Sequence, residues 1–504
     1  MKPFQSLIFL LLVTIFVTLI SYLLAFQDIN FFNIYKIKPI NFADIIKQDT
    51  TKTVDISSII ENNKESLKEN LKKESVKDTV SIIIKTDSSK IKLKSTALKI
   101  ENLKSKIYNL EFPNNNKSQL YNFFKNLIYS KKTIHVLHIG DSQLEGDRIT
   151  SFIRNKFQKK FGGSGVGLIP AKRLVKAFSL NQKSSDNWRR YSVANTHNNV
   201  IFSRSSIMGG FCRYTKFYND TLKDTTVYSA TINIEASSSS YYLDRNYKQI
   251  KIFYGNNFKP FFIELYDNDK LLDFSTAMSG KSLKIYKYKF KKTPKKLIIK
   301  FTGKDSPDVY GISLEGTSGV VFDNIAIRGS SGTFFTRLNQ SVTKQILKEL
   351  NTKMLILEFG GNAVPYIKDK KGAASYGRWF YSQLINLKSK INGLPIIVIG
   401  PADMSTKENS KFVTYPNLKY VREEMRKQCF KAGCIYWDMY KAMGGENSMP
   451  QWVNADPQLA ISDYTHFTSK GAKIIANMFY NSLIYEYNEY LKTIKKQNKL
   501  KKIS

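Results

Sequence analysis

Residues 133–142 read Thr-Ile-His-Val-Leu-His-Ile-Gly-Asp-Ser, and this pattern determines the architecture that we expect. The run up to Ile139 contains no Lys, Arg, Asp or Glu. A short, uninterrupted apolar run that ends at a glycine is typical of a strand buried on both faces of a parallel sheet. His135 and His138 lie three residues apart, hence on opposite faces of the strand. We expect them to be buried and hydrogen-bonded rather than metal ligands.

Outward from this strand, the pattern alternates between helix and strand. A helix is expected upstream, over residues 118–129. Downstream of residue 330 the expected helices cover residues 335–350, 373–390, 417–431 and 468–490, and the expected strands cover residues 354–359, 395–400 and 434–437. Strands that alternate with helices form parallel βαβ units. The fold class is therefore α/β, with helices on both faces of a parallel sheet.

Residues 176–318 have a different composition. Short β-rich runs occur at residues 226–234, 249–254, 260–266, 282–290 and 296–301, and clusters of Gly, Asn and Asp separate several of them. Short strands at close spacing, divided by turn residues, are typical of an all-β sandwich. We therefore expect a β-sandwich inserted into the α/β domain.

The amino-terminal residues 4–26 contain no charged side chain and are long enough to cross the roughly 30 Å hydrocarbon core of a membrane. Lys2 precedes them, which favours a cytoplasmic amino terminus. The run ends Leu-Ala-Phe at residues 24–26 and not in the small-residue site of a cleaved signal peptide. We expect an uncleaved signal anchor that holds the rest of the chain outside the cytoplasm, in the periplasm or cell envelope. Secretion after signal cleavage is the alternative.

These patterns divide the chain into six segments. They are a membrane anchor (residues 1–27), a Lys-, Ser- and Asn-rich spacer (28–116), the first part of the α/β domain (117–175), the inserted sandwich (176–318), the second part of the α/β domain (319–490) and a basic tail (491–504). The spacer shows no sustained periodicity, so we expect it to be helical in part at most.

The 504 residues include 78 Lys and Arg against 41 Asp and Glu, a formal net charge of +37. The basic residues gather in Lys-rich stretches, mostly without the interleaved aromatic residues of a stacking platform, so no nucleic-acid partner is expected. Solvated surface accounts for the charge, and attraction to an anionic envelope polymer or a membrane is the alternative. Three Cys cannot form a disulfide scaffold, and four His leave few ways to build a metal site.

Two local motifs suggest nucleophilic catalysis. Ser142 directly follows the first strand, and open α/β sheets place their sites at the carboxyl ends of strands. Asp463 and His466 lie three residues apart before the last expected helix, so the carboxylate can hold one imidazole nitrogen while the other faces a serine. The alternatives are a helix-capping turn at Ser142 and a capping loop with a solvent-facing His466.

Two more strand ends carry hydrogen-bond donors suited to an oxyanion. Asn362 supplies a side-chain amide after the expected strand 354–359, and Gly329 supplies a backbone N–H after the apolar run that ends at Ile327. Together with the N–H of Ser142 they would form an oxyanion hole. These signals reinforce one another because each lies at a strand end.

The set Ser142, Gly329, Asn362 and His466 resembles the four sequence blocks of the SGNH (GDSL-type) hydrolases. The resemblance implies that Ser142 is the nucleophile, that Gly329 and Asn362 donate to the oxyanion, and that Asp463 and His466 complete the triad. It also implies a three-layer, flavodoxin-like domain and a reaction without metal or organic cofactor. The first block reads Gly-Asp-Ser-Gln where the family name has Leu after Ser, and the third reads Gly-Gly-Asn-Ala where many members have Asp after Asn. Neither change touches a catalytic atom.

Further motifs are similar to the peptidoglycan O-acetylesterase branch, in which a carbohydrate-binding-like β-sandwich separates the first two blocks. They are Phe-Gly-Gly-Ser-Gly-Val-Gly at residues 161–167, Trp-Asp at 437–438, Ala-Met-Gly-Gly at 442–445, and Trp452. This branch implies a serine esterase that removes O-acetyl groups from an envelope polysaccharide, with peptidoglycan as the first choice. One alternative is an O-acetyltransferase that uses the same site beside a membrane-bound acyl exporter. The other is an inactive, anchored polysaccharide-binding scaffold.

Several residues have two interpretations. The aromatic residues of the sandwich region that could stack on sugars or form its core are Trp188, Tyr214, Tyr241 and Tyr242. Arg148 and Arg328 could meet a substrate carboxylate or pair with local acids. Cys429 and Cys434 could form a disulfide or remain buried thiols.

Overall fold

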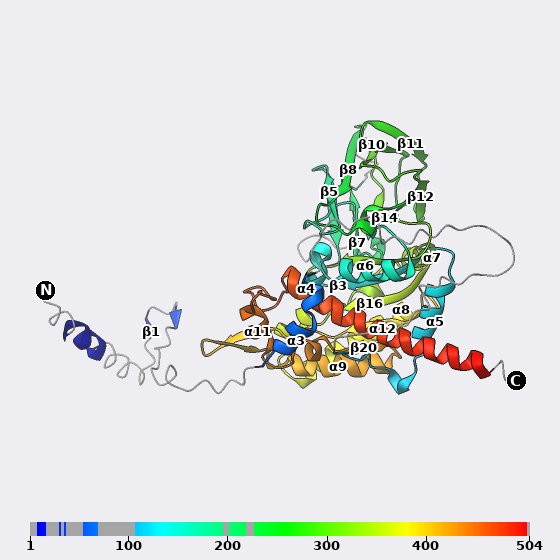
Figure 1. Ribbon diagram of the computed structural model, residues 1–504. Coiled ribbons are helices and arrows are strands. Elements are labelled where there is room, and N and C mark those ends of the chain that lie inside the picture. Colours follow the sequence, from blue (N-terminus) through cyan, green and yellow to red (C-terminus); the bar gives the residue numbers. More distant parts are fainter. Residues whose placement is uncertain are drawn as a thin grey trace.

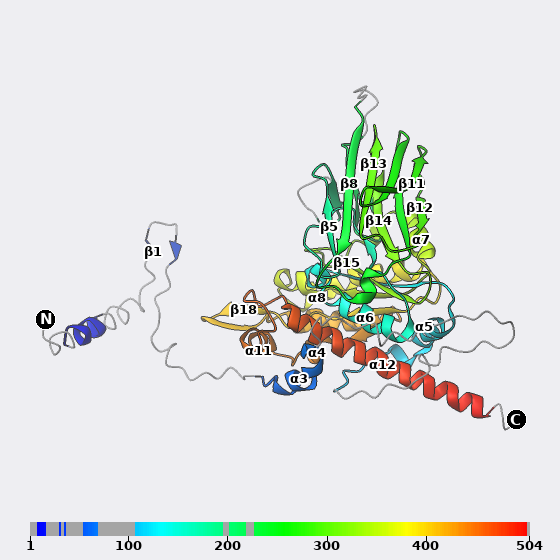
Figure 2. The ribbon, with the colours of Figure 1, turned by 45° about the horizontal axis from the view of Figure 1, so that its top comes forward.

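The computed structural model describes residues 8–16, 30–31, 35–36, 54–68, 106–194, 201–217 and 226–500. Figure 1 shows an α/β unit with a β-rich unit above it, and Figure 2 shows the long strands of that second unit side by side. Helix α12 (Ser469–Leu500) crosses the α/β unit and extends beyond it (Figure 2). It therefore includes much of the stretch expected as a basic tail.

The α/β unit is built on a parallel sheet in the order β15-β3-β16-β17-β20. Its strands are β3 (Ile134–Gly140), β15 (Val320–Ala326), β16 (Thr352–Glu358), β17 (Ile396–Ile399) and β20 (Ile435–Trp437). In chain order the arrangement is 2-1-3-4-5, the order of flavodoxin-like folds. The prediction of an α/β fold with a parallel sheet is confirmed.

Helices cover both faces of this sheet. Helices α5 (Ser118–Tyr129), α6 (Thr150–Phe161) and α12 share one core with Val136 and Ile356. Helices α7 (Gln340–Glu349), α8 (Lys370–Lys388) and α9 (Leu418–Lys431) share the other with Leu137 and Leu357. Neighbouring strand residues point to opposite faces, so an unbroken apolar strand serves two cores at once.

The β-rich unit is a sandwich of two antiparallel sheets. One has the order β11-β10-β13-β8-β5, and the other the order β12-β9-β14-β7-β6, with β4 also paired to β14. The strands are β4 (Gly167–Ile169), β5 (Leu180–Ser184), β6 (Arg189–Ser192), β7 (Gly210–Arg213), β8 (Tyr228–Ala236), β9 (Gln249–Gly255), β10 (Phe261–Asp267), β11 (Lys270–Ala277), β12 (Lys284–Lys289), β13 (Lys296–Gly303) and β14 (Asp308–Glu315). Alternating residues such as Leu297, Ile299 and Phe301 fill the space between the sheets.

Part of the stretch expected as a spacer packs on the α/β unit. Residues 54–68 include α3 (Ser57–Asn62) and α4 (Lys64–Lys68), and α4 contacts α12. Ile56 and Ile59 join the core, and Asn477 Nδ2 donates to Asn63 Oδ1 at 2.8 Å. Glu111 forms a β-bridge with Tyr436, at the edge of the sheet. These contacts were not expected because two short helices carry little periodic signal.

The expected membrane span lies mostly outside the described residues. Residues 8–16 are helical and their side chains are exposed. No helix in the described ranges is both long enough and apolar enough to cross a membrane.

His135 of β3 connects the two units through buried ionic contacts. Its Nδ1 lies 2.8 Å from Asp323 Oδ2 on β15, and its Nε2 lies 2.8 Å from Glu315 Oε2 on β14. The backbone N–H of Leu168, on β4, donates to Asp323 Oδ1 at 2.7 Å. Burial disfavours the charged imidazole, but the two carboxylates outweigh it and raise the pKa of His135 to about 10. The expectation that His135 and His138 are buried and hydrogen-bonded is confirmed.

The His135 contacts predict a pH-dependent stability. A histidine whose pKa rises from 6.5 to about 10 on folding stabilises the folded state fully below pH 6.5, and this contribution is lost as the pH rises through 10. Denaturant titrations of the full chain from pH 6.5 to 10 should show an unfolding free energy that falls by up to about 1.4 kcal/mol per pH unit from this group. His135→Gln should be less stable and lack this part of the slope.

NMR of histidine-labelled protein checks the same group without a substitution. One imidazole should remain protonated at pH 8.5. If all the imidazoles are neutral there, the ionic account of these contacts is wrong.

Candidate active site

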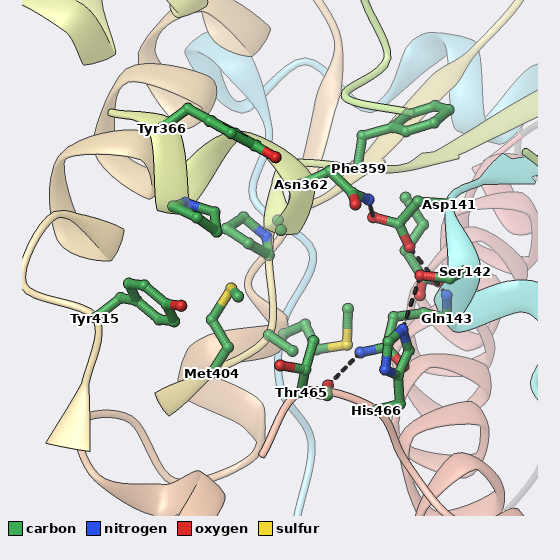
Figure 3. A pocket seen from close by; sticks show the side chains of 17 residues that line it. Asp141, Ser142, Gln143, Phe359, Asn362, Tyr366, Met404, Tyr415, Thr465 and His466 are labelled. Atoms are coloured by element: carbon green, nitrogen blue, oxygen red, sulfur yellow. Dashed lines mark hydrogen bonds between the residues drawn. The ribbon is translucent and has the colours of Figure 1, made fainter. Parts of the chain in front are cut away.

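Loops at the carboxyl edge of the parallel sheet converge on one site (Figure 3). Ser142 opens the 3-10 helix η4 (Ser142–Asp147) directly after β3, and Asp141 Oδ1 caps this turn by accepting from the Gln143 N–H at 3.0 Å. Asn362 lies in η9 (Gly361–Tyr366) after β16. His466 comes from the loop between α11 (Ser448–Asn454) and α12. The parallel sheet brings together segments more than 300 residues apart.

Ser142, His466 and Asp463 form one line of hydrogen bonds. Ser142 Oγ lies 2.8 Å from His466 Nε2, and His466 Nδ1 lies 2.7 Å from Asp463 Oδ2. Asp463 Oδ1 accepts from the backbone N–H groups of Thr465 and His466 at 2.9 Å. Partial burial opposes ionisation of Asp463, but these hydrogen bonds outweigh it and lower its pKa. The structure thus places the three predicted residues in the geometry of a Ser-His-Asp unit.

Gln143 joins the serine loop to the histidine loop. Its Nε2 donates to the Thr465 carbonyl at 2.6 Å, and its Oε1 accepts from the Phe467 N–H at 3.5 Å. Arg148 donates to the Phe467 carbonyl as well, and to the Glu145 carbonyl at 3.1 Å. This role of Gln143 was not predictable from the sequence, because its partners lie more than 300 residues away.

The two predicted oxyanion donors differ in their placement. Asn362 lines the site, but its Nδ2 donates to Asp141 Oδ2 at 2.9 Å and to the Ser330 carbonyl at 3.2 Å. Both amide N–H bonds are therefore in use, and one must be released before Asn362 can bind an oxyanion. Gly329 is exposed and is not among the described residues that line the cavity.

Two carboxylates that the sequence analysis did not single out lie behind the nucleophile. Asp141 is buried, and this burial together with the charge of Glu358 raises its pKa to about 7, although the Gln143 and Asn362 donors oppose the rise. Glu358 Oε2 lies 3.1 Å from His138 Nε2. His138 Nδ1 in turn lies 3.0 Å from Thr150 Oγ1. The support for the Ser142 loop therefore extends across β3 to β16 and α6.

The Ser142–His466 pair opens into a cavity of about 270 Å³. Its apolar wall consists of Phe359, Pro365, Pro401, Ala402, Met404 and Met439. Tyr366 and Tyr415 also line it, and Tyr366 is 84% exposed (Figure 3). This volume lies just below the usual range for small-molecule sites, so the cavity suits a small apolar group carried on a larger molecule.

A hairpin holds the histidine loop from outside. Strands β18 (Ser405–Glu408) and β19 (Lys411–Thr414) are joined by Asn409 and Ser410, both in the left-handed region as a tight hairpin turn requires. Phe412 stacks on Tyr464 with ring centroids 3.6 Å apart and planes at 10°. Tyr464 lies between Asp463 and His466 and has φ +55°, a strained conformation for an aromatic residue. The stacked rings support this conformation.

The remaining candidates lie away from this chemistry. Trp188, Tyr214 and Tyr241 are buried, which favours the core interpretation, and Tyr242 is 43% exposed. Arg328 pairs with Glu145 at 2.9 Å. Cys429 and Cys434 are buried free thiols. Within the described ranges, no group of His, Cys, Asp or Glu side chains is arranged to hold a metal ion.

Comparisons with known proteins agree with this architecture. Residues 286–479 match the family GDSL-like Lipase/Acylhydrolase, a region that contains Gly329, Asn362, Asp463 and His466 and begins after Ser142. A solved structure titled "Peptidoglycan O-acetylesterase in action, 5 min" aligns with TM-score 0.58 and 18% identity over 76% of this chain and 99% of that chain, which shows a shared fold. An acetyl xylan esterase aligns with TM-score 0.25 and 15% identity over 33% of this chain and 81% of that chain. No curated protein matches the chain.

Replacement of the triad acid should lower turnover without loss of the fold. Asp463→Asn removes the charge that holds the imidazole, so kcat on a chromogenic acetyl ester should fall by up to about 10⁴, and Ser142→Ala should abolish turnover. Asp269→Asn, an exposed acid in the β10–β11 turn, is the matched control. Unchanged kinetics in Asp463→Asn would contradict the triad assignment.

Loss of the Phe412 ring should affect kcat more than KM. Aromatic pairs contribute about 0.5–1.5 kcal/mol, so Phe412→Ala should reduce kcat about 2- to 10-fold through a looser Asp463–His466 loop. Phe412→Tyr should restore it because a ring again stacks on Tyr464. An effect on KM alone, or no rescue by Tyr, would show that the hairpin does not position the histidine.

Proposed function

We propose that this chain, an ester hydrolase that resembles the SGNH (GDSL-type) hydrolases, removes O-acetyl groups from a cell-envelope polysaccharide, with peptidoglycan as the polymer. The observation that carries the proposal is the Ser142–His466–Asp463 line at the mouth of a small, largely apolar cavity. The fold shared with a peptidoglycan O-acetylesterase over nearly all of that chain supports the choice of polymer.

The geometry assigns a role to each side chain of the triad. His466 Nε2 takes the proton of Ser142 as its Oγ attacks the ester carbonyl, and Asp463 stabilises the resulting imidazolium. The tetrahedral intermediate collapses when His466 protonates the leaving sugar oxygen. Water then attacks the acetylated serine with His466 again as base, and acetate leaves. One ester and one water thus give one acetate and one sugar hydroxyl.

Asn362 is the donor whose contacts change during this reaction. Its amide is bound to Asp141 and Ser330 in the free site, so transfer of one N–H to the developing oxyanion exchanges one hydrogen bond for another. The backbone N–H groups of Ser142 and Gly329 are the further donors in the proposed hole.

The uncharged run at residues 4–26 supports a location at the envelope. An uncleaved anchor would keep the hydrolase domain outside the cytoplasm and near its polymer. The net charge of +37 would favour contact with an anionic envelope.

Acetate release from O-acetylated peptidoglycan tests the proposal. The full chain should release acetate from this polymer faster than from O-acetylated xylan, and Ser142→Ala should lower the rate by at least about 10³. Peptidoglycan freed of its O-acetyl groups by mild alkali is the blank.

An added sugar acceptor separates hydrolysis from transfer. Free acetate in the presence of the acceptor supports the esterase. Acetyl groups that appear on the acceptor would show that the protein is a transferase and not an esterase. If wild type and Ser142→Ala are equally inactive on every ester, the inactive polysaccharide-binding scaffold is the remaining hypothesis.

A further inference from the structure

A small cavity of about 40 Å³ lies at the seam between the sandwich and the α/β sheet, outside the catalytic cavity. Glu145 and Gly146 of η4 form one wall, and Ala326 at the end of β15 forms another. Ser142 and Gln143 of the same short helix line the catalytic cavity, so one turn of the chain contributes to both cavities. A ligand group held in the seam cavity would therefore lie close to the catalytic serine.

Two arginines on this cavity have no carboxylate partner among the described residues. Arg173 Nε donates to Gln182 Oε1 at 3.0 Å, and Gln182 Nε2 donates to the carbonyls of Pro170 and Ala171. This holds the guanidinium in place. Arg190 reaches from β6 toward the Ala326 carbonyl, 3.4 Å from its Nη2.

Arg173 and Arg190 are half-buried, and the fully buried arginines of the described residues differ from them. Arg154 contacts Asp147 and Asp244, and Arg213 contacts Asp305 and Asp308. Buried charges in proteins are normally paired in this way. Two neighbouring, half-buried guanidinium groups that have no carboxylate partner among the described residues are suited to bind an external anion.

The local electrostatics favour an added negative charge. Burial and the nearby positive charges of Arg154 and Arg190 lower the pKa of Arg173 to about 10, against the attraction of Asp147. Glu145, the acid on the cavity wall, is neutralised from outside by Arg328. The cavity thus has an excess of positive charge.

A larger cavity of about 560 Å³ continues from the first along the edge strand β5. The two share Arg173, Leu174 and Val175. The larger one adds three basic side chains, Lys176, Lys183 and Lys296, and one acid, Glu235. This basic groove, residues 173–176 with Lys183 and Lys296, has a volume larger than a single ion would fill.

We propose that Arg173 and Arg190 bind a carboxylate of an acidic glycan and thereby place the ester of a neighbouring sugar at Ser142. The inference rests on the proposed esterase function and specifies its substrate as carboxylate-bearing. Guanidinium groups match carboxylates in shape and charge. Pro170, Leu174 and Met208 beside them give the cavity an apolar side, which suits an acid carried on a carbon skeleton better than a free inorganic anion.

Kinetics on two forms of one polymer test this site. O-acetylated peptidoglycan fragments are used with free carboxylates or after amidation of those carboxylates. Arg173→Gln and Arg190→Gln in the full chain should raise KM on the acidic fragments at least about tenfold. The two substitutions should leave KM on the amidated fragments and on a small chromogenic ester unchanged.

Arg189→Gln is the matched control, since Arg189 is exposed, precedes Arg190 and does not line either cavity. Arg190→Lys keeps the charge and should therefore raise KM on the acidic fragments less than Arg190→Gln does. Equal effects of the substitutions on acidic and amidated fragments, or equal effects of Arg189→Gln and Arg190→Gln, would overturn the proposal.

Equilibrium binding separates this site from the esterase itself. Wild type should bind the acidic fragments more tightly than the amidated ones, and Arg190→Gln should remove the difference. If no ester is hydrolysed but this difference persists, the proposed function fails and the carboxylate site stands. If the protein hydrolyses the ester but binds acidic and amidated fragments equally, the carboxylate site is wrong and the esterase function stands.

Discussion

The buried contacts of His135 with Asp323 and Glu315 are the constraint on which the rest of the structure depends. They join β3 and β15 of the parallel sheet to β14 of the sandwich, and Asp323 also binds the backbone of β4. A buried charge is costly unless it is paired, so these elements can come together in few other ways. Gly167 shows how tight the junction is, because a Cβ there would lie 2.2 Å from Asp323 Oδ1. The seam between the two units is therefore a defined surface and not a flexible joint.

Strand β3 also fixes the position of the active site. The strand that carries His135 ends at Gly140, two residues before Ser142, and its neighbours β15 and β16 lead to Gly329 and Asn362. His138, on the other face of β3, holds Glu358, which lies next to Asp141 behind the nucleophile. Burial is the main reason for the raised pKa of Asp141, and the nearby charge of Glu358 adds to it. The nucleophile loop is thus supported from both faces of one strand.

Local patterns predicted much of the fold, and contacts distant in sequence explain most of the rest. Strand β3 was predictable because it is apolar throughout, whereas β14 was not, because it begins with Asp308 and ends with Glu315. Both acids are buried only because partners far along the chain neutralise them. Ser142, Asp463 and His466 were predictable from strand ends and a three-residue spacing. Gln143 and Phe412 were not, since their roles arise from the Asp463–His466 loop, to which they are joined only in three dimensions.

The size of the catalytic cavity limits what it can recognise. About 270 Å³ lined by Met404, Met439 and Phe359 can select a small acyl group, but a polymer chain must lie largely outside it. Apolar pockets also discriminate weakly between similar small groups. If the substrate is an acetylated polymer, as proposed, selection among such polymers has to come from surfaces beside the cavity. Two such surfaces among the described residues are the exposed Tyr366 at the rim and the basic groove, and of these two the groove has the charge that would favour an acidic glycan over a neutral one.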